Sequence, residues 1–261
     1  MNLGKPIPVE DLEFIHTRVD VERLRSMRGC ITGATGWFGN WICSALDYMG
    51  CKYIKLDTRD LHTFDCDYCI HLAHGEVKGL INMLKPLDVK HVLFISSGAV
   101  YDRELSEYGY TKLEHENLFL ASGLPVNIAR CFTFTGLGVC QKALAIGEFI
   151  NRAKFGEPIE VYNQGRTVRT YMYMAEMVAW LLNILLSPKG NIVDVGGSEP
   201  VCIFDLAHKI SDNVVMMDAP YYFKEARPIY IPNLKPANEM GLMVEIGLDE
   251  AIQRTIKAEW Q

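Results

Sequence analysis

The stretch Arg28-Gly-Cys-Ile-Thr-Gly33-Ala-Thr-Gly36-Trp-Phe-Gly39 sets the expectation for the fold. Its first five residues form a short, mostly apolar run that predicts a strand, and residues 40–49 beyond it have the pattern of a helix. Glycines are needed where a chain turns tightly, where backbone approaches a pyrophosphate, and where a helix packs closely on a strand. A helix N-terminus also offers N–H donors to phosphates. The stretch therefore predicts a dinucleotide site, although glycines also form plain turns.

A second short strand is predicted at residues 53–56, and Asp57 follows it. An acidic side chain about 20 residues beyond the glycine turn can accept hydrogen bonds from the adenosine ribose hydroxyls. Asp57 therefore favours NAD as the cofactor. Arg59 leaves NADP as an alternative, because a guanidinium can bind a 2′-phosphate.

Strands and helices alternate along much of the remaining chain. Strands are predicted at residues 68–73, 91–96 and 126–130, and helices at residues 11–27 (with Asp11 as N-cap), 77–84, 108–120, 146–155 and 176–186. This alternation predicts the α/β class, with a doubly wound parallel sheet covered by helices on both faces.

From about residue 137 the sequence mixes short strands with helices, as expected of a smaller lobe. We therefore expect an N-terminal helical extension at 1–27 and an NAD(P)-binding domain at 28–136 with parts of 160–200. Residues 137–261 are expected to form mainly the substrate lobe.

The segment Tyr108-Gly-Tyr-Thr-Lys112 carries a candidate base. Residues four apart share one face of a helix, so the Lys112 ammonium can lie near the Tyr108 phenol. An ordinary tyrosine, with a pKa near ~10, is a poor base at neutral pH. A nearby ammonium and a positive nicotinamide ring both favour the phenolate, which makes Tyr108 a usable base toward a hydroxyl. The same spacing also occurs by chance on surface helices.

Ser96-Ser97-Gly98-Ala99-Val-Tyr101 follows an apolar strand. Ligands of open parallel sheets bind at the carboxyl ends of the strands, and a hydroxyl placed there can hydrogen-bond the reacting oxygen. A pair of serines is also common in turns.

Together these segments resemble the extended short-chain dehydrogenase/reductases, the NAD-dependent epimerase/dehydratase family, over nearly the whole chain. The similar segments are residues 32–39 (TGxTGFxG), 70–73 (HLA), 96–101 (SSxxVY), 108–112 (YxxxK), 129–136 (LRxFNxYG), 165–176 (GxxxRxfxyVxD) and 191–196 (YNxG). The N-terminal segment resembles a subgroup often encoded with surface-polysaccharide genes. The resemblance implies a Rossmann-type sheet, a smaller C-terminal α/β substrate lobe, NAD, and a nucleotide-diphosphate sugar as substrate.

By this resemblance Ser97, Tyr108 and Lys112 are the catalytic residues. The implied cofactor-binding residues are Gly33, Thr35, Gly36, Trp37, Phe38, Gly39, Asp57, Arg59, Leu72, Ala73, Tyr108 and Lys112. Thr133 stands where the family has an asparagine near the nucleotide phosphates, and Arg169 and Arg227 are candidates to reach the diphosphate. Arginines are also common as surface or ion-paired residues.

The shared first step of the family is oxidation of a sugar hydroxyl. A 4,6-dehydratase of the family carries an acid and a base directly after the catalytic hydroxyl, where this chain has Gly98 and Ala99. The resemblance therefore favours an epimerase acting at C4. The alternatives are an NAD(P)H-dependent 4-keto-sugar reductase and a catalytically silent, NAD(P)-binding regulatory protein. Several loops are shorter than in the family, and loops normally carry substrate contacts. By family resemblance we also expect a homodimer.

The bulk properties restrict the class of protein further. The chain has 261 residues and a net charge of −6, which gives it no general attraction for nucleic acid. No segment approaches the ~20 apolar residues that cross a membrane, and the charged N-terminus lacks a secretory apolar region. We therefore expect a cytoplasmic enzyme.

Most of the eight cysteines lie in apolar runs, which is typical of buried residues in a reducing compartment. Cys66, Cys69, His71 and His74 would suggest zinc only with a second ligand pair, which the sequence lacks. We therefore predict that the protein binds no metal.

Overall fold

The computed structural model describes residues 5–57, 65–75, 77–102, 104–142, 144–218 and 229–260. The chain divides into two compact units. The first unit comprises residues 1–131, 175–195 and 235–242, and the second comprises residues 132–174, 196–234 and 243–261. The expected division into 1–27, 28–136 and 137–261 assigns functions to segments, and it stays a prediction.

The first unit is built on a six-stranded parallel sheet with the order β10-β5-β4-β3-β1-β2. The strands are β1 (Arg28–Thr32), β2 (Lys52–Leu56), β3 (Tyr68–His71), β4 (His91–Ser97), β5 (Val126–Cys131) and β10 (Ile192–Val195). From β1 the chain adds β2 on one side, whereas β3, β4 and β5 follow one another on the other side. The order thus reverses between β1 and β3, and ligands of such sheets bind at the carboxyl ends of the strands beside this point.

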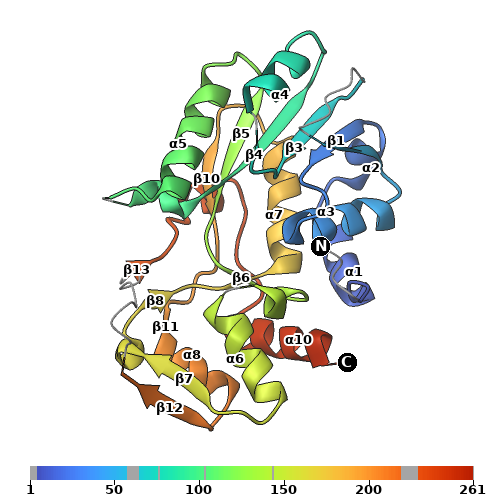
Figure 1. Cartoon of the computed structure of the whole chain (residues 1–261). Helices are drawn as coiled ribbons and strands as arrows, with labels where there is room; N and C mark the ends of the chain where they lie inside the picture. The colour runs from blue at the N-terminus through green and yellow to red at the C-terminus, as the bar shows by residue number, and fades with distance from the viewer. Residues whose placement is uncertain are drawn as a thin grey trace. The chain divides into compact units, whose positions relative to one another are not determined.

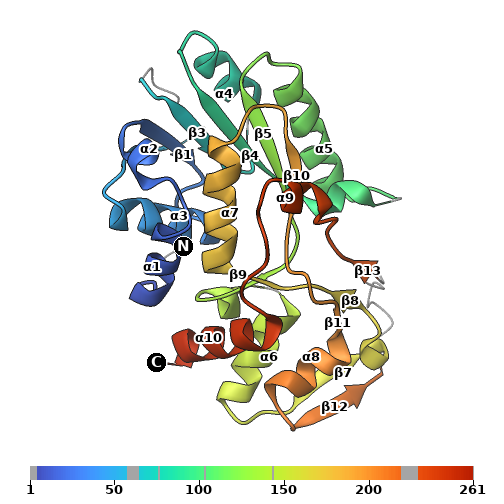
Figure 2. The same cartoon turned by 180° about the vertical axis from the view of Figure 1, so that it is seen from behind.

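Helices cover both faces of this sheet (Figures 1 and 2). On one face lie α3 (Trp37–Tyr48) and α7 (Met174–Leu186), and on the other lie α4 (Val77–Leu84) and α5 (Glu107–Leu120). The core between sheet and helices α4 and α5 is apolar; its fully buried members include Cys30, Leu80, Phe94 and Phe119. The predicted α/β class is confirmed.

The N-terminal segment differs from the single helix expected at residues 11–27. It forms α1 (Val9–His16) and α2 (Val21–Arg25), because the Asp20 carboxylate accepts a hydrogen bond from the Arg23 backbone N–H at 3.0 Å and so starts a new helix. Asp11 is not the N-cap, because α1 already begins at Val9: Pro8 takes the N-cap position without a side-chain hydrogen bond, and Asp11 is buried within α1.

The second unit contains three small sheets. Their strands are β6 (Phe134–Thr135) with β9 (Met172–Tyr173), β7 (Ile159–Tyr162) with β12 (Val214–Met217), and β8 (Val168–Arg169) between β11 (Val201–Cys202) and β13 (Ile229–Tyr230). Its α-helices are α6 (Ala145–Lys154), α8 (Ile203–Ile210) and α10 (Leu248–Trp260), with 3-10 turns η2 (Val139–Gln141) and η3 (Asn163–Gly165). The short α9 (Lys235–Glu239) and the 3-10 turn η1 (Gly98–Tyr101) belong to the first unit.

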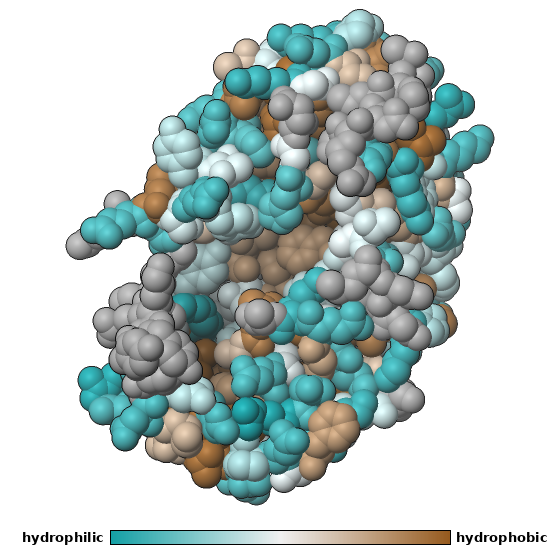
Figure 3. Space-filling view, viewed as in Figure 1, coloured by the Kyte–Doolittle hydropathy of each residue, from teal (hydrophilic) through white to brown (hydrophobic). Residues whose placement is uncertain are grey.

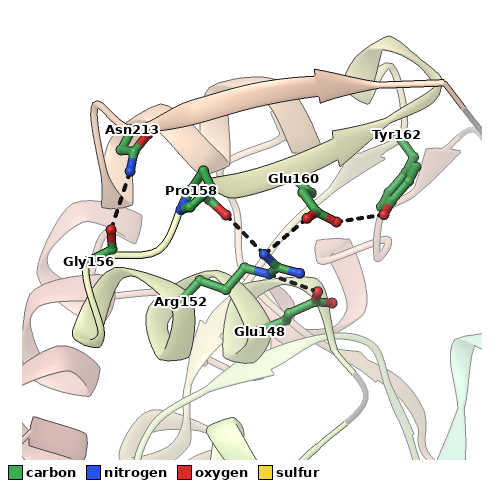
Figure 4. Close-up of polar contacts among 7 residues, drawn as sticks. All are labelled: Glu148, Arg152, Gly156, Pro158, Glu160, Tyr162 and Asn213. Carbon is green, nitrogen blue, oxygen red and sulfur yellow. Dashed lines mark hydrogen bonds and ion pairs between the residues drawn. The ribbon is translucent and has the colours of Figure 1, made fainter.

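One arginine joins α6 to β7 in the second unit (Figure 4). The Arg152 guanidinium donates to Glu148 at 3.3 Å, to Glu160 at 3.3 Å and to the Pro158 carbonyl at 3.1 Å. The Tyr162 hydroxyl donates to the second Glu160 oxygen at 2.7 Å. Carboxylates from a helix and a strand thus share one cation, which fixes the corner between them.

The surface in Figure 3 is largely hydrophilic, with hydrophobic residues between the polar ones. Within the described residues, no helix is long and apolar enough to span a membrane.

Candidate active site

The glycine turn between β1 and α3 lies directly against the end of β3. Gly33 has a φ of +67°, and a Cβ placed there would come within 2.8 Å of the Ala73 nitrogen and 2.9 Å of the Leu72 carbonyl carbon. A Cβ on Gly39 would lie 2.4 Å from the Gly33 oxygen. The fold itself therefore requires glycine at both positions, and it brings the predicted cofactor residues of the turn next to Leu72 and Ala73.

Gly36 is different, because neither its backbone conformation nor its packing requires a glycine. Its φ is −75°, a value open to any residue, and a Cβ there would meet only the Gly33 oxygen, at 3.3 Å. Gly36 is exposed and forms the N-cap of α3 without a side-chain cap. Bare backbone at a helix N-terminus is the arrangement that lets a pyrophosphate approach the N–H groups. The turn therefore fits a dinucleotide.

The other predicted cofactor residues lie around this turn in different environments. Thr35 and Asp57 are exposed, and Asp57 directly follows β2. Trp37 is buried, and Phe38 is partly buried with its ring 5.7 Å from that of Trp37. Arg59 lies outside the described residues.

Thr32, at the end of β1, holds the end of β3 in place. Its hydroxyl oxygen accepts hydrogen bonds from the Leu72 and Ala73 backbone at 3.2 and 3.4 Å. The same oxygen lies 2.7 Å from Nδ1 of His71, a fully buried side chain. Burial, with a smaller contribution from the Lys112 ammonium, lowers the pKa of His71 to about 3.

Ser97 and Tyr108 come together through the turn after β4. The buried Ser97 hydroxyl accepts a hydrogen bond from the Ala99 N–H at 3.2 Å, which starts η1. Ser106 caps α5 by accepting from Gly109 N–H at 3.1 Å. A Cβ on Gly109 would lie 2.8 Å from the Ala99 oxygen, so this glycine lets α5 pack closely on η1. In this position the side chains of Ser97 and Tyr108 are hydrogen-bonded.

Lys112 lies one helical turn beyond Tyr108, as the spacing predicts, and it is buried. Its ammonium donates to the Ile95 carbonyl at 2.8 Å and lies 6.0 Å from the centre of the Tyr108 ring. Burial lowers the pKa of Lys112 to about 8, against the opposing effects of Cys131 and Glu116.

The pKa of Tyr108 is raised above its ordinary value. Burial raises it, the hydrogen bond with Ser97 lowers it, and Cys131 raises it; the sum is an increase. The ammonium of Lys112 is engaged by Ile95 and is separated from the ring, so desolvation dominates. In this state the phenol keeps its proton at neutral pH.

The sequence motifs did not indicate the role of Glu116, one further turn along α5. Its carboxylate is buried and accepts hydrogen bonds from the Ser96 hydroxyl at 2.5 Å and from Arg130 at 3.0 and 2.7 Å. This two-point contact is the strong geometry for a guanidinium and a carboxylate. One signal in the sequence could have indicated it: Tyr108, Lys112 and Glu116 are four residues apart, and residues at that spacing share one helix face.

Two more side chains extend this network to the edge of the sheet. Arg130 donates to the Tyr101 hydroxyl at 2.7 Å, and that hydroxyl donates to Asp194 at 2.9 Å. The network thus links β4, α5, β5, η1 and β10, and it fixes the helix that carries Tyr108 and Lys112 to the sheet.

His74 lies beside Tyr108 in the first unit. The two ring centres are 5.7 Å apart and the planes are inclined by 56°. In the sequence His74 was grouped with Cys66, Cys69 and His71, but those cysteines hydrogen-bond with Cys30 in the core. Among the described residues, no group of three or more His, Cys, Asp or Glu could hold a metal ion.

The predicted substrate residues belong to the second unit. Thr133 is buried, and its carbonyl accepts from the Met172 N–H at 3.0 Å. The Arg169 guanidinium lies 5.6 Å from the centre of the Tyr230 ring and donates to the Val168 carbonyl at 2.8 Å. Arg227 lies outside the described residues.

One curated protein is similar to this chain in sequence. UDP-glucuronic acid decarboxylase 1 of Danio rerio is 27% identical over 177 residues, which cover 64% of this chain and 40% of that protein. The chain thus spans about two fifths of the length of this relative.

Solved structures with the same fold include two nucleotide-sugar epimerases. UDP-glucose 4-epimerase of Thermotoga maritima, determined with UDP-glucose, has a TM-score of 0.76 and 17% identity, with 89% of this chain and 98% of that chain covered. UDP-glucuronic acid 4-epimerase of Bacillus cereus, determined with NAD, has a TM-score of 0.74 and 18% identity, with 89% and 96% covered. The Rossmann-type fold expected from the motifs is confirmed.

The model of the NAD dependent epimerase/dehydratase family matches residues 67–196, a segment that contains Ser97, Tyr108 and Lys112. With the glycine turn, the parallel sheet and the segments of Ser97, Tyr108 and Lys112 in this order, the chain belongs to the NAD-dependent epimerase/dehydratase family of enzymes.

Proposed function

We propose that this protein is an NAD-dependent nucleotide-sugar epimerase that inverts C4 through a transient keto-sugar. The observation that carries the proposal is the hydrogen-bonded pair Ser97 and Tyr108, with Lys112 buried one helical turn away. A hydroxyl, a phenol and an ammonium at the carboxyl end of a parallel sheet are suited to remove a proton from a sugar hydroxyl.

The residues around the glycine turn would hold the cofactor. Gly33, Gly36 and the N-terminus of α3 would bind the pyrophosphate, and Asp57 would bind the adenosine ribose. When bound, NAD supplies a hydride acceptor that can return the hydride to either face of the sugar.

Tyr108 would take the proton of the substrate hydroxyl, and Ser97 would hydrogen-bond the same oxygen. Because the pKa of Tyr108 is raised in the described state, its ionisation needs positive charge nearby. Lys112 provides such a charge only below its own pKa of about 8. After the hydride returns, Tyr108 gives the proton back to the new hydroxyl.

The two positions after Ser97 hold Gly98 and Ala99, which cannot transfer protons. This favours epimerisation over dehydration through those two positions. We further propose that Thr133, Arg169 and Arg227 bind the nucleotide diphosphate. We also propose that the protein forms a homodimer through α5 and its neighbouring helix, lies in the cytoplasm and acts in surface-polysaccharide synthesis.

The Tyr108→Phe variant tests the proposal, with Tyr110→Phe as a matched control on an exposed tyrosine of the same helix. With NAD and either UDP-glucose or UDP-glucuronic acid, the wild type should form the C4 epimer, measured by proton NMR. Tyr108→Phe should lose about 100-fold or more of this rate, and Tyr110→Phe should keep it. Full activity of Tyr108→Phe would disprove the mechanism. Stoichiometric consumption of added NADPH with a keto-sugar would instead identify a reductase.

A further inference from the structure

His74 is a titratable side chain that the proposed hydride chemistry does not use. It follows the end of β3 by three residues, and its ring lies 5.7 Å from the Tyr108 ring. Both side chains are exposed; 45% of Tyr108 is accessible. A sugar whose oxygen is held by Tyr108 has its neighbouring carbon only one bond further away. The His74 ring thus lies beside the phenol that would hold the sugar oxygen.

The surroundings of His74 keep its imidazole neutral. Although His74 reaches solvent, its partial burial lowers its pKa below the usual value, and the Lys112 ammonium on α5 lowers it further. Two other titratable groups interact with it: Tyr108, a phenol with a raised pKa, and His71 on β3, which is neutral because its own pKa is about 3. A neutral imidazole carries one nitrogen with a lone pair, so it can accept a proton at pH 7.

We infer that His74 is a second general base of this site, which removes the hydrogen from the carbon next to the keto group. The inference rests on the proposed function, which supplies the ketone by oxidising the hydroxyl. A ketone makes the hydrogens on its neighbouring carbons acidic. The C–H bond breaks, its proton goes to the free nitrogen of His74, and the electron pair moves onto the carbonyl oxygen.

The resulting enolate oxygen accepts a hydrogen bond from the Tyr108 hydroxyl, which holds the proton taken from the substrate. When the proton returns to carbon, the C–H bond re-forms and the ketone is restored. No oxidant or reductant is consumed in this step. Return from the opposite side would invert a second carbon of the sugar, which gives the site an activity beyond C4 epimerisation.

Deuterium exchange tests this step without any nicotinamide cofactor. The full-length chain is incubated with UDP-4-keto-6-deoxyglucose in D2O, and mass spectrometry follows deuterium on the sugar carbons. The wild type should catalyse the exchange, and His74→Phe should lower the rate about 100-fold or more, because the ring contact stays but the base is gone. His74→Asn, which is polar but not basic, should also lose the exchange.

The matched control is His16→Phe, since His16 also contacts a tyrosine ring, that of Tyr48 at 6.1 Å, in the first unit. This variant should keep the wild-type exchange rate. Equal exchange in the wild type and His74→Phe, or no exchange above the solvent rate in the wild type, would overturn the inference. Epimerisation of UDP-glucose without deuterium exchange would contradict only the role of His74 as a second base. Deuterium exchange without epimerisation would contradict only the proposed C4 epimerase activity.

Discussion

Gly33 and Gly36 occupy the same turn, yet they have different reasons to be glycine. Gly33 has a positive φ and contacts the end of β3, whereas Gly36 is exposed with an ordinary φ. Gly33→Ala should lower the free energy of unfolding by at least about 1–2 kcal/mol, because a side chain strains that conformation. Gly36→Ala should change it by less than about 1 kcal/mol.

Gly36→Ala should weaken cofactor binding much more than it weakens folding. A methyl group on Gly36 would stand in the path of the pyrophosphate, so the Kd for NAD should rise about tenfold or more, or about 1.4 kcal/mol. Urea unfolding and calorimetric titration with NAD measure the two effects. Unchanged NAD affinity in a well-folded Gly36→Ala variant would place the pyrophosphate elsewhere.

For individual residues, the sequence predicted that Tyr108 and Lys112 lie near each other, but it could not predict the direction of the Tyr108 pKa shift. The spacing of Tyr108 and Lys112 placed them on one face of a helix, and the structure has them there. The direction of the Tyr108 pKa depends on burial, which raises it, and on the contact with Ser97, which lowers it by less. Both are properties of the packed state, so no spacing rule could give them.

At the scale of elements, α5 depends on the ion pair between Glu116 and Arg130. The side chains are 2% and 16% exposed, and the shortest contact is 2.7 Å. Removing one partner leaves a buried charge without compensation, so Arg130→Met should cost about 3–5 kcal/mol of unfolding free energy. The double variant Glu116→Gln/Arg130→Met should cost less than the sum of the two single changes, by about 1–3 kcal/mol.

A double-mutant cycle in urea measures this coupling. Additive effects would show that the two side chains act independently. Arg152→Met is a useful comparison, because its carboxylate partners are much more exposed than Glu116. Its cost should stay near the range of surface ion pairs, about 0–1 kcal/mol per pair.

Helix and strand bounds were predicted correctly where a local sequence pattern marks them, and wrongly where it does not. The bounds of β1 and α4 agree with those expected, because an apolar run or a helical period is contained within each segment. The N-terminal segment was predicted as one helix, since its apolar residues continue through the break. The N-cap formed by Asp20 starts a second helix and so divides the segment. Apolar periodicity contains no information about such a cap.

For the whole molecule, the features that the sequence could not predict are contacts between residues that are distant along the chain. Tyr101 and Asp194 are hydrogen-bonded although 93 positions separate them. The Asn183 side chain on α7 donates a hydrogen bond to the Arg18 carbonyl at 2.8 Å. The first unit gathers residues 175–195 and 235–242 from beyond the second unit's first segment. Periodicity describes neighbours along a chain, so these long-range pairings had no sequence signal.

The stability of the protein against acid should depend on His71. Its folded pKa of about 3 lies below its usual value of 6.5, and its Nε2 has no hydrogen-bond partner among the described residues. Between these pH values the unfolded chain binds a proton that the folded chain excludes, so stability falls as pH falls from 6.5 toward 3. The loss from this group at pH ~4.5 should be about 2–3 kcal/mol relative to neutral pH.

His71→Gln isolates this contribution, because glutamine takes up no proton. The variant should be less stable than the wild type at neutral pH, since it disturbs the bond to Thr32. Between neutral pH and pH ~4.5 it should lose about 2–3 kcal/mol less than the wild type in urea unfolding. His208→Gln, at an exposed position on α8, should retain the wild-type dependence. Equal losses in His71→Gln and the wild type would mean that His71 is protonated in the folded protein, and the buried, neutral imidazole would have to be abandoned.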